Sequence, residues 1–351
     1  MPLPEFERVH RIQGEHLVEG LLNVVVFGPG RGESCVVRLP NGELGVVDGC
    51  RKTNDPTLAL LNSLRERDSR LAFVALTHPH DDHYGGLAEL LDRWSGHVGE
   101  VWRTVYGPRY SKQLLRLVSA QRAGKPGLLP DESRSNELRD VLSAFEDVWD
   151  TGTGKQLIVG RSLFKCAIPD GHPVEVTAWG PADRDNERHN QALVRAVLAR
   201  SREDTHPSVD PNQASGALLV QWGEARILLA GDLLCGTRPD SGWRAARSLA
   251  DRPVQVVNVA HHASEEAHDE ELWGMMAPQL AIVTPFKGAV GKQPPRPEMI
   301  KTLCASSAVV ITSPPKWAEE ASQHGLRVVL QFPRVVRTTK GALRNRPAHP
   351  S

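Results

Sequence analysis

Hydrophobic and polar positions in the N-terminal third of the chain alternate in the way that paired strands do. Apolar, β-branched runs at 22–27, 34–39 and 43–47 predict three strands. The pair Asn41-Gly42 lies between the last two runs, and this pair is a strong hairpin signal. We therefore expect the chain to begin with antiparallel strands.

The next segments alternate between helical spacing and short buried runs. Leucines on one side of 56–67 predict a helix, and the continuous apolar run 71–76 predicts a strand buried on both faces. A helix at 87–94 and a strand at 98–105 follow in the same way. This order is typical of a strand, helix, strand unit inside a larger sheet.

A similar alternation returns in the C-terminal part of the chain. Strands come early in each half and helices interleave later, which favours an α/β sandwich of two sheets with helices outside over a single parallel sheet. The predicted strands are 216–222, 225–230, 254–260, 280–284, 308–312 and 326–332, and the predicted helices are 266–276 and 297–304.

The middle of the chain has a weaker pattern. We expect a single domain over 1–335 with a helical insertion at about 108–211, followed by a basic, disordered tail at 336–351. Within the insertion the expected elements are helices at 111–121, 137–149 and 186–200, a strand at 174–179 and a polar loop at 201–213.

Composition narrows the function classes. The 351 residues carry a formal net charge of +0 and a sequence pI near 7.3, which argues against non-specific nucleic-acid binding through the whole surface but leaves a local basic groove open. None of the five cysteines forms a C-x-x-C pair, so no structural zinc knot is expected and a reducing compartment suits the chain. The N-terminus has no apolar leader and no run is long enough for a membrane span, so we expect a soluble, cytoplasmic protein.

One short motif carries the candidate chemistry. His78, His80, Asp82 and His83 have the spacing H-x-H-x-D-H and directly follow the strand predicted at 71–76. Crowded nitrogen and carboxylate ligands suit Zn²⁺, with Mn²⁺ as the alternative, rather than Ca²⁺. One loop cannot aim all four groups at one ion without strain. We therefore expect the first two histidines to share one metal, and Asp82 and His83 to reach a second.

A two-metal centre needs further ligands from elsewhere in the chain. Asp232 follows the strand predicted at 225–230, and His262 follows the one at 254–260. Ligands at the carboxyl ends of buried strands can converge on one site. We expect Asp232 to bridge the two metals and His262 to complete the second.

With these residues in view, the chain resembles the metallo-β-lactamase superfamily, and more narrowly the nuclease-type domain of the ComEC competence protein and its soluble relatives. The resemblance implies an αββα sandwich, agrees with the ligand roles above, and implies that Asp48 braces the metal loop from behind. The segments that carry it are 28–34, 46–49, 77–86, 212–215 with 228–232, and 261–264.

The chain departs from the family pattern in places. Many members place another ligand histidine after the strand that follows the motif helix, whereas here the only nearby histidine, His97, precedes that strand. The first metal is therefore expected to lack one protein ligand. Gln293 and the prolines after it stand near a family His-Pro, which puts the matching substrate contact in doubt, and Ala263 stands where relatives have glycine.

The expected activity is hydrolysis by a metal-bound hydroxide, with a phosphodiester, including nucleic acid, as the substrate. Asp82 and His261 are the candidate catalytic residues, one to orient the water or take its proton and the other to donate a proton or bind substrate. Ser215 is expected to support the metal loop by hydrogen bonding. The candidate substrate contacts are Ser215, Lys287 and Arg296.

Two other functions remain open on the sequence alone. The same metal pair would serve a hydrolase of carboxylic esters, thioesters or lactones. A non-catalytic partner or a subunit of a larger assembly is the second alternative, and the insertion at about 108–211 offers a surface for a protein partner.

Overall fold

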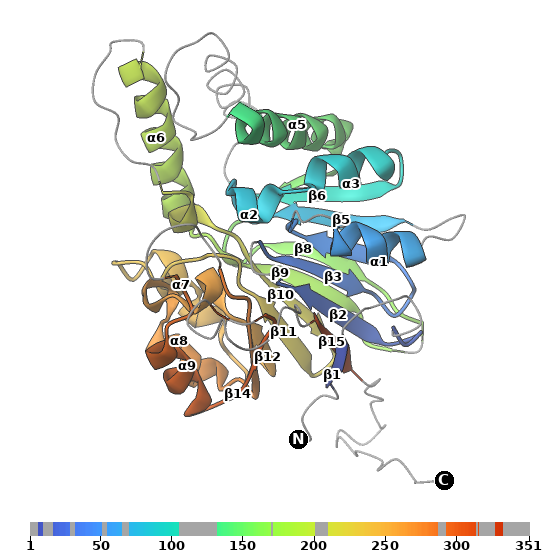
Figure 1. Ribbon diagram of the computed structural model, residues 1–351, viewed down its shortest axis with the longest axis vertical. Coiled ribbons are helices and arrows are strands. Elements are labelled where there is room, and N and C mark those ends of the chain that lie inside the picture. Colours follow the sequence, from blue (N-terminus) through green and yellow to red (C-terminus); the bar gives the residue numbers. More distant parts are fainter. Residues whose placement is uncertain are drawn as a thin grey trace.

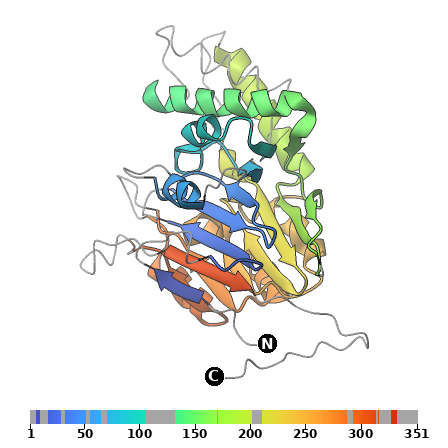
Figure 2. The same cartoon turned by 90° about the vertical axis from the view of Figure 1, so that its right-hand side faces the viewer.

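A computed structural model of the protein describes residues 6–9, 17–28, 32–50, 55–64, 70–104, 132–169, 171–200, 210–286, 293–313, 315 and 327–332. Two β-sheets lie face to face, and helices cover the outer face of each (Figure 1). The view turned by 90° shows the same layers with the first sheet toward the viewer (Figure 2). This is the αββα sandwich that the sequence predicts. The helix expected at 111–121 and the basic tail at 336–351 lie outside the described residues.

The first sheet combines antiparallel and parallel pairing. Pairs from β1 to β4 are antiparallel, and pairs from β4 to β7 are parallel. The last described strand, β15, lies between β1 and β2, so the first and last described strands are neighbours in this sheet. The strand order is β1 (Phe6–Val9), β15 (Arg327–Phe332), β2 (Leu22–Phe27), β3 (Ser34–Arg38), β4 (Leu44–Val47), β5 (Leu71–Leu76), β6 (Val98–Arg103) and β7 (Gly154–Gln156).

The second sheet has the same mixture of pairing. Strands β11 to β14 are parallel neighbours, and β8 to β11 are antiparallel neighbours. The strand order is β14 (Ala308–Ile311), β13 (Leu280–Val283), β12 (Val256–Asn258), β11 (Ala225–Leu229), β10 (Ala217–Trp222), β9 (Val174–Gly180) and β8 (Ser162–Cys166).

Helices bury their apolar sides on the outer faces of the sheets. The first sheet is covered by α1 (Pro56–Leu64), α3 (Leu87–Arg93) and α5 (Glu132–Val148), and the second by α7 (Gly242–Ala246), α8 (Glu270–Met276) and α9 (Pro297–Cys304). A longer helix, α6 (Asp183–Arg200), projects from the body beside the short α2 (Asp81–Tyr84) (Figure 1). The remaining turns are η2 (Trp149–Thr153), η3 (Pro211–Ala214), η4 (Arg247–Leu249), η5 (Ala260–Ala263) and η6 (Glu265–Ala267).

Three apolar layers hold the sandwich together. The central layer lies between the sheets and includes Phe73, whose ring stacks on Trp102 with centroids 4.1 Å apart. The outer layers join each sheet to its own helices, for example Phe145 of α5 and Trp243 of α7. Burial of such rings on both faces explains why 71–76 has no polar position.

Some boundaries differ from the prediction for physical reasons. The strand expected at 254–260 spans only Val256–Asn258, and the chain turns into a left-handed conformation from His261 onward. The helix expected from residue 266 begins at Glu270, because Asp269 caps it by accepting a hydrogen bond from the Leu272 amide. Part of the expected insertion at about 108–211 belongs to the sandwich itself. Its strand β7 extends the first sheet, and its strands β8 and β9 extend the second.

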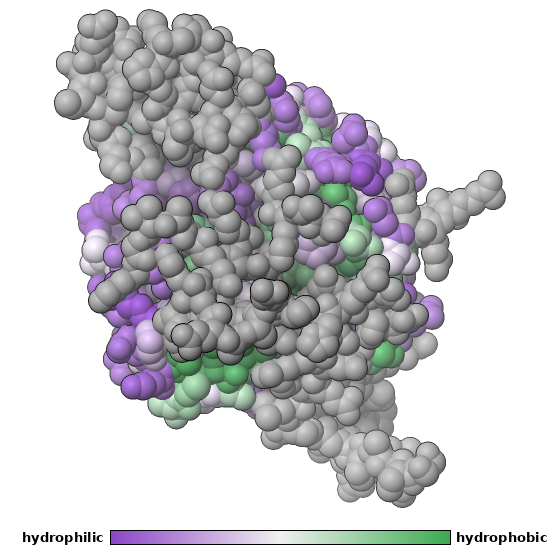
Figure 3. Space-filling model, viewed as in Figure 1, coloured by the Kyte–Doolittle hydropathy of each residue, from purple (hydrophilic) through white to green (hydrophobic). Residues whose placement is uncertain are grey.

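The described surface is mainly hydrophilic in the view of Figure 3, with hydrophobic groups gathered near its lower edge. Among the described side chains, the large hydrophobic ones that are exposed are Val18 and Met275. None of the described helices combines the length and the apolar character that a membrane crossing requires.

Candidate metal centre

The motif segment lies at the end of β5, where Asp48 holds it from behind. The buried Asp48 carboxylate accepts hydrogen bonds from the Thr77 amide at 2.7 Å and from the Thr77 hydroxyl at 2.6 Å. The same carboxylate lies 2.7 Å from Nδ1 of His83. One carboxylate thus fixes both ends of the segment that carries the candidate ligands.

The candidate ligand atoms form two sets that share one carboxylate. Within each set all ligand atoms lie within 4.8 Å of one another; the first set is His78, His80 and Asp232, and the second is Asp82, His83, Asp232 and His262. Asp232 Oδ2 lies 3.6 Å from His78 Nε2, whereas its Oδ1 lies 3.3 Å from His83 Nε2. The two oxygens of Asp232 therefore face different nitrogens, as a bridging ligand requires.

Groups outside the two sets fix the rings of His83 and His262. His83 donates from Nδ1 to the Asp48 carboxylate, and His262 Nδ1 donates to the Thr284 carbonyl at 2.7 Å. A ring nitrogen that donates keeps its proton, so the neutral ring presents a lone pair at Nε2. Both rings thus direct the nitrogen that can bind a metal toward the shared site.

The ring of His78 is fixed in a similar way, by the hydroxyl group of Thr77. Thr77 donates its only hydroxyl proton to Asp48 and therefore can only accept from His78 Nδ1, which lies 3.1 Å away. This leaves the His78 Nε2 lone pair for the site, 3.1 Å from His80 Nδ1.

The buried polar atoms of the cluster fit a cation. Among the described side chains, His83 Nε2 and Asp232 Oδ1 are both buried and have no hydrogen-bond partner. When the His83 ring is neutral, both atoms offer lone pairs 3.3 Å apart, so they repel unless a proton or a metal cation lies between them. A divalent metal held by nitrogen and carboxylate oxygen satisfies both atoms.

Electrostatic interactions within the cluster also favour the binding of a cation. Burial would lower the pKa of His83 and His262, but nearby carboxylates, Asp232 foremost, raise the first well above its usual value and the second to about 9. Burial would raise the pKa of Asp82 and Asp232, yet the His83 charge holds both well below their usual value. Burial, and then His83, lowers the pKa of His78. The carboxylates therefore stay ionised and attract a cation.

Comparison with known proteins identifies the family. The family model described as the metallo-beta-lactamase superfamily matches residues 28–283. The chain belongs to the metallo-β-lactamase superfamily. The match spans β5, β11 and β12, which carry every residue of the two ligand sets at their carboxyl ends. Members of this superfamily are hydrolases that bind divalent metals.

Several solved structures resemble the chain at low identity. The metallo-beta-lactamase fold protein YhfI from Bacillus subtilis is 9% identical, with 89% of this chain and 100% of that chain covered and a TM-score of 0.43. Zn²⁺-bound PqqB from Methylobacterium extorquens is 11% identical, with 87% and 99% covered and a TM-score of 0.42. Human tRNase Z, short form, is 13% identical, with 82% and 96% covered and a TM-score of 0.39. No curated protein sequence matches the chain.

A tight turn holds the carboxylate of Asp232, which the two candidate ligand sets share. Gly231 adopts a φ of 52°, and a Cβ added to it would lie 2.5 Å from the Gly216 carbonyl oxygen. Only glycine fits this approach. The Asp232 amide then donates to the Ser215 hydroxyl at 2.9 Å. Ser215 is fully buried behind the ligands, so its hydroxyl supports them; this position does not suit the substrate contact also expected for Ser215.

The histidine pair at the end of β12 has strained backbone. His261, His262 and Ala263 have φ values of 49°, 56° and 63°, each in the left-handed region. Each such residue costs on the order of 1 kcal/mol, which glycine would avoid. The turn brings His261 Nε2 to 4.0 Å from Asp232 Oδ2 while His262 joins the second ligand set. Burial lowers the pKa of His261.

Glu33 is a site residue whose role the sequence did not reveal. Its buried carboxylate accepts hydrogen bonds from Asn258 Nδ2 at 2.6 Å and from the Thr284 hydroxyl, and its amide donates to the Asp82 carbonyl at 3.0 Å. Thr284 in turn holds His262, so Glu33 joins ligands from both sheets. Burial raises the pKa of Glu33 to about 7. Its place in the turn at 28–34 was the available signal.

Two basic residues, Arg296 and Lys287, are expected to bind substrate, and the structure describes only the first. Arg296 is at the start of α9, where its Nη1 lies 3.4 Å from the Glu265 carboxylate, and its side chain is 52% exposed. Lys287 lies outside the described residues.

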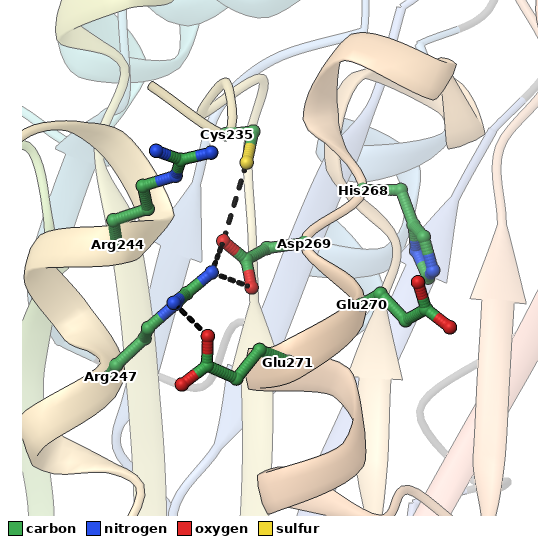
Figure 4. A pocket seen from close by; sticks show the side chains of 7 residues that line it. All are labelled: Cys235, Arg244, Arg247, His268, Asp269, Glu270 and Glu271. Carbon is green, nitrogen blue, oxygen red and sulfur yellow. Dashed lines mark hydrogen bonds and ion pairs between the residues drawn. The ribbon is translucent and has the colours of Figure 1, made fainter. Parts of the chain in front are cut away.

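A polar cluster on the helix side of the second sheet ties two ligand loops together. Asp269 accepts from Arg247 at 2.8 and 2.7 Å and from Cys235 Sγ at 3.3 Å (Figure 4). Cys235 follows Asp232 in its loop, and Asp269 ends the loop that carries His262. The cluster lines a pocket between α7 and α8 with Cys235, Arg244, Arg247, His268, Asp269, Glu270 and Glu271.

Proposed function

We propose that the protein is a two-metal phosphodiesterase or nuclease. The observation that carries the proposal is the position of Asp232 between the two ligand sets, with Oδ2 beside His78 and Oδ1 beside His83. A shared carboxylate of this kind suits two cations a few ångströms apart. Paired cations favour phosphodiester cleavage because they can stabilise both the attacking and the leaving oxygen of an in-line displacement.

The bound cations would lower the pKa of a shared water and offset negative charge on the attacked group. The protein's own residues do the rest. Asp82 is the most open carboxylate of the cluster, with its side chain 11% exposed against 3% for Asp232. Its Oδ2 lies 3.2 Å from His262 Nε2, so it is placed both to hold a cation and to receive a proton from the attacking water.

Zn²⁺ is the favoured cation, because both histidines of the second set donate their other ring nitrogen to a backing group, His83 to the Asp48 carboxylate and His262 to the Thr284 carbonyl, as zinc-binding histidines do. Mn²⁺ is the alternative. His80 is partly exposed, and the first set offers three protein ligands among the described residues, which leaves room for substrate or water at that ion.

The experiment is a substrate panel on purified protein stripped with a chelator and reloaded with Zn²⁺ or Mn²⁺. We expect metal-dependent release from bis-(p-nitrophenyl) phosphate, or nicking of DNA, and loss of that activity in Asp232→Ala. Asp92→Ala, an exposed carboxylate on α3, is the matched control and should retain activity.

Turnover of p-nitrophenyl acetate, thioesters or lactones without any phosphodiester cleavage would replace the proposal with a carboxylic ester hydrolase on the same centre. Failure of the protein to retain any divalent metal, together with no turnover, would leave the non-catalytic alternative.

A further inference from the structure

Asn212 and His261 form a contact beside the shared carboxylate that the metal centre itself does not use. Asn212 Nδ2 lies 3.1 Å from His261 Nε2, and that ring nitrogen lies 4.0 Å from Asp232 Oδ2. Asn212 is 6% exposed. The contact joins segments far apart in the chain, so it depends on the folded site rather than on local sequence.

The turn η3 holds Asn212 rigidly. The Asp210 carboxylate accepts a hydrogen bond from the Asn212 amide at 3.0 Å, and the Asn212 carbonyl accepts one from the Ser215 amide at 3.1 Å. Ser215 in turn supports Asp232. The same short turn therefore positions a metal-site residue at one end and His261 at the other.

The direction of the hydrogen bond decides the state of the His261 ring. An amide NH₂ group only donates, so the ring nitrogen that faces it must offer a lone pair. The proton of neutral His261 is then on Nδ1. That nitrogen is buried, and among the described residues it has no hydrogen-bond partner; the same holds for Asn212 Oδ1. Among the described residues, the hydrogen bond that orients the ring is therefore the one from Asn212 to Nε2.

We propose that Asn212 is a positioning residue that fixes the orientation and the Nδ1–H form of the His261 ring, so that the ring stays beside the shared carboxylate of Asp232. The proposal rests on the proposed hydrolytic function, because the partly exposed ring would then line the place where a phosphodiester binds. Without Asn212 the ring can rotate or exchange its proton between the two nitrogens. Binding or turnover would then fall while both metal sets stay intact.

The test reads the proton position directly, by long-range ¹H–¹⁵N spectra of histidine-labelled full-length protein, with and without Zn²⁺. His261→Gln identifies the His261 signals. We expect the Nδ1–H form in the parent protein, the Nε2–H form in Asn212→Asp, whose carboxylate accepts, and a mixture in Asn212→Leu, which does neither. Asn186→Leu is the matched control: it removes a buried amide that donates to the Leu157 carbonyl and should leave the His261 signals unchanged.

Kinetics supply the second readout. Asn212→Leu should lower kcat/KM by about 10- to 100-fold with unchanged zinc content. An Nε2–H form in the parent, an unchanged proton position in Asn212→Asp, or a metal-coordinated His261 nitrogen in the zinc-loaded spectra would each overturn the proposal. Because the spectra need no substrate, a failed activity panel with the expected spectra would count against the phosphodiesterase assignment and not against the role of Asn212.

Discussion

Asp48 Oδ2 lies 2.7 Å from His83 Nδ1, and this contact sets which nitrogen of His83 can bind a metal. Asp48 itself sits in the left-handed region with a φ of 59°, a conformation that asparagine also adopts. The carboxylate accepts from three donors at once, two of them on Thr77. The orientation of a candidate ligand ring thus depends on a residue outside both ligand sets.

Asp48→Asn should move the proton of the neutral His83 ring to the other nitrogen. The amide can turn its NH₂ group toward His83, which forces Nδ1 to accept and places the proton on Nε2, where the metal must bind. We expect zinc affinity to fall by about 10- to 100-fold, as for other residues that back a metal ligand. Competition with a chromophoric chelator measures the affinity. Asp92→Asn on the surface of α3 is the control, and equal affinity in both variants would show that Asp48 does not set the His83 ring.

Spacing and burial predicted which distant residues lie beside the motif at 78–83. Asp232 and His262 each follow an apolar run, and strand ends in a sandwich converge on one edge, so their proximity to His78 follows from pattern alone. The contact between Glu33 and Thr284 could not be found in this way, because it depends on the packing of loops from two different sheets.

The fold prediction also failed where the structure depends on contacts between distant segments. β7 and β8 lie in the weakly patterned middle of the chain. All three residues of β7 are half-buried and those of β8 alternate only partly, so tertiary pairing rather than local sequence makes them strands. The left-handed turn at His261 was equally hard to place, since a histidine pair after an apolar run is compatible with a continued strand as well as with a turn.

The shared carboxylate predicts a pattern of metal loss. His80→Ala should remove the ion of the first set and leave one ion per chain, because the second set stays complete. His262→Ala should do the reverse, and Asp232→Ala should weaken both sites. Elemental analysis after dialysis counts the ions. His97→Ala alters an exposed histidine outside both sets and should retain the parent content; a loss there would add His97 to the first site.

Metal affinity should rise with pH. Burial would lower the pKa of His262, but Asp232 and the hydrogen bond to Asp82 raise it to about 9, so the metal-free ring is protonated at neutral pH. A cation must displace that proton, and affinity should increase about tenfold per pH unit for each proton displaced below pH 9. Titration calorimetry in buffers of different ionisation enthalpy would detect the released proton. No proton release at pH 7 would contradict the raised pKa.

The metal-free protein should show the opposite trend in stability. The folded-state pKa of His262 lies above the unfolded value of 6.5, so its stabilising contribution is complete below pH 6.5 and is lost as pH rises to about 9. Chemical denaturation of chelated protein across that range measures the effect. His262→Gln should flatten this part of the profile, and a parent profile that rises instead would contradict the assignment.

The ion pair between Arg247 and Asp269 allows effects on stability to be measured apart from effects on metal binding (Figure 4). Asp269→Asn keeps the cap on α8 but loses the ion pair, and because Arg247 is partly exposed we expect a loss of only about 1 kcal/mol in the free energy of unfolding. Asp269→Ala also removes the cap and should cost about 1 kcal/mol more. Denaturation of the metal-free variants gives both values.

Both Asp269 variants should still bind two ions, because the ligand side chains themselves are untouched. The cluster acts on the loops of Asp232 and His262 only through backbone position, so its loss should lower zinc affinity less than Asp48→Asn does. If Asp269→Asn lowered affinity as much as Asp48→Asn while leaving stability unchanged, the cluster would be part of the metal site rather than a support for its loops.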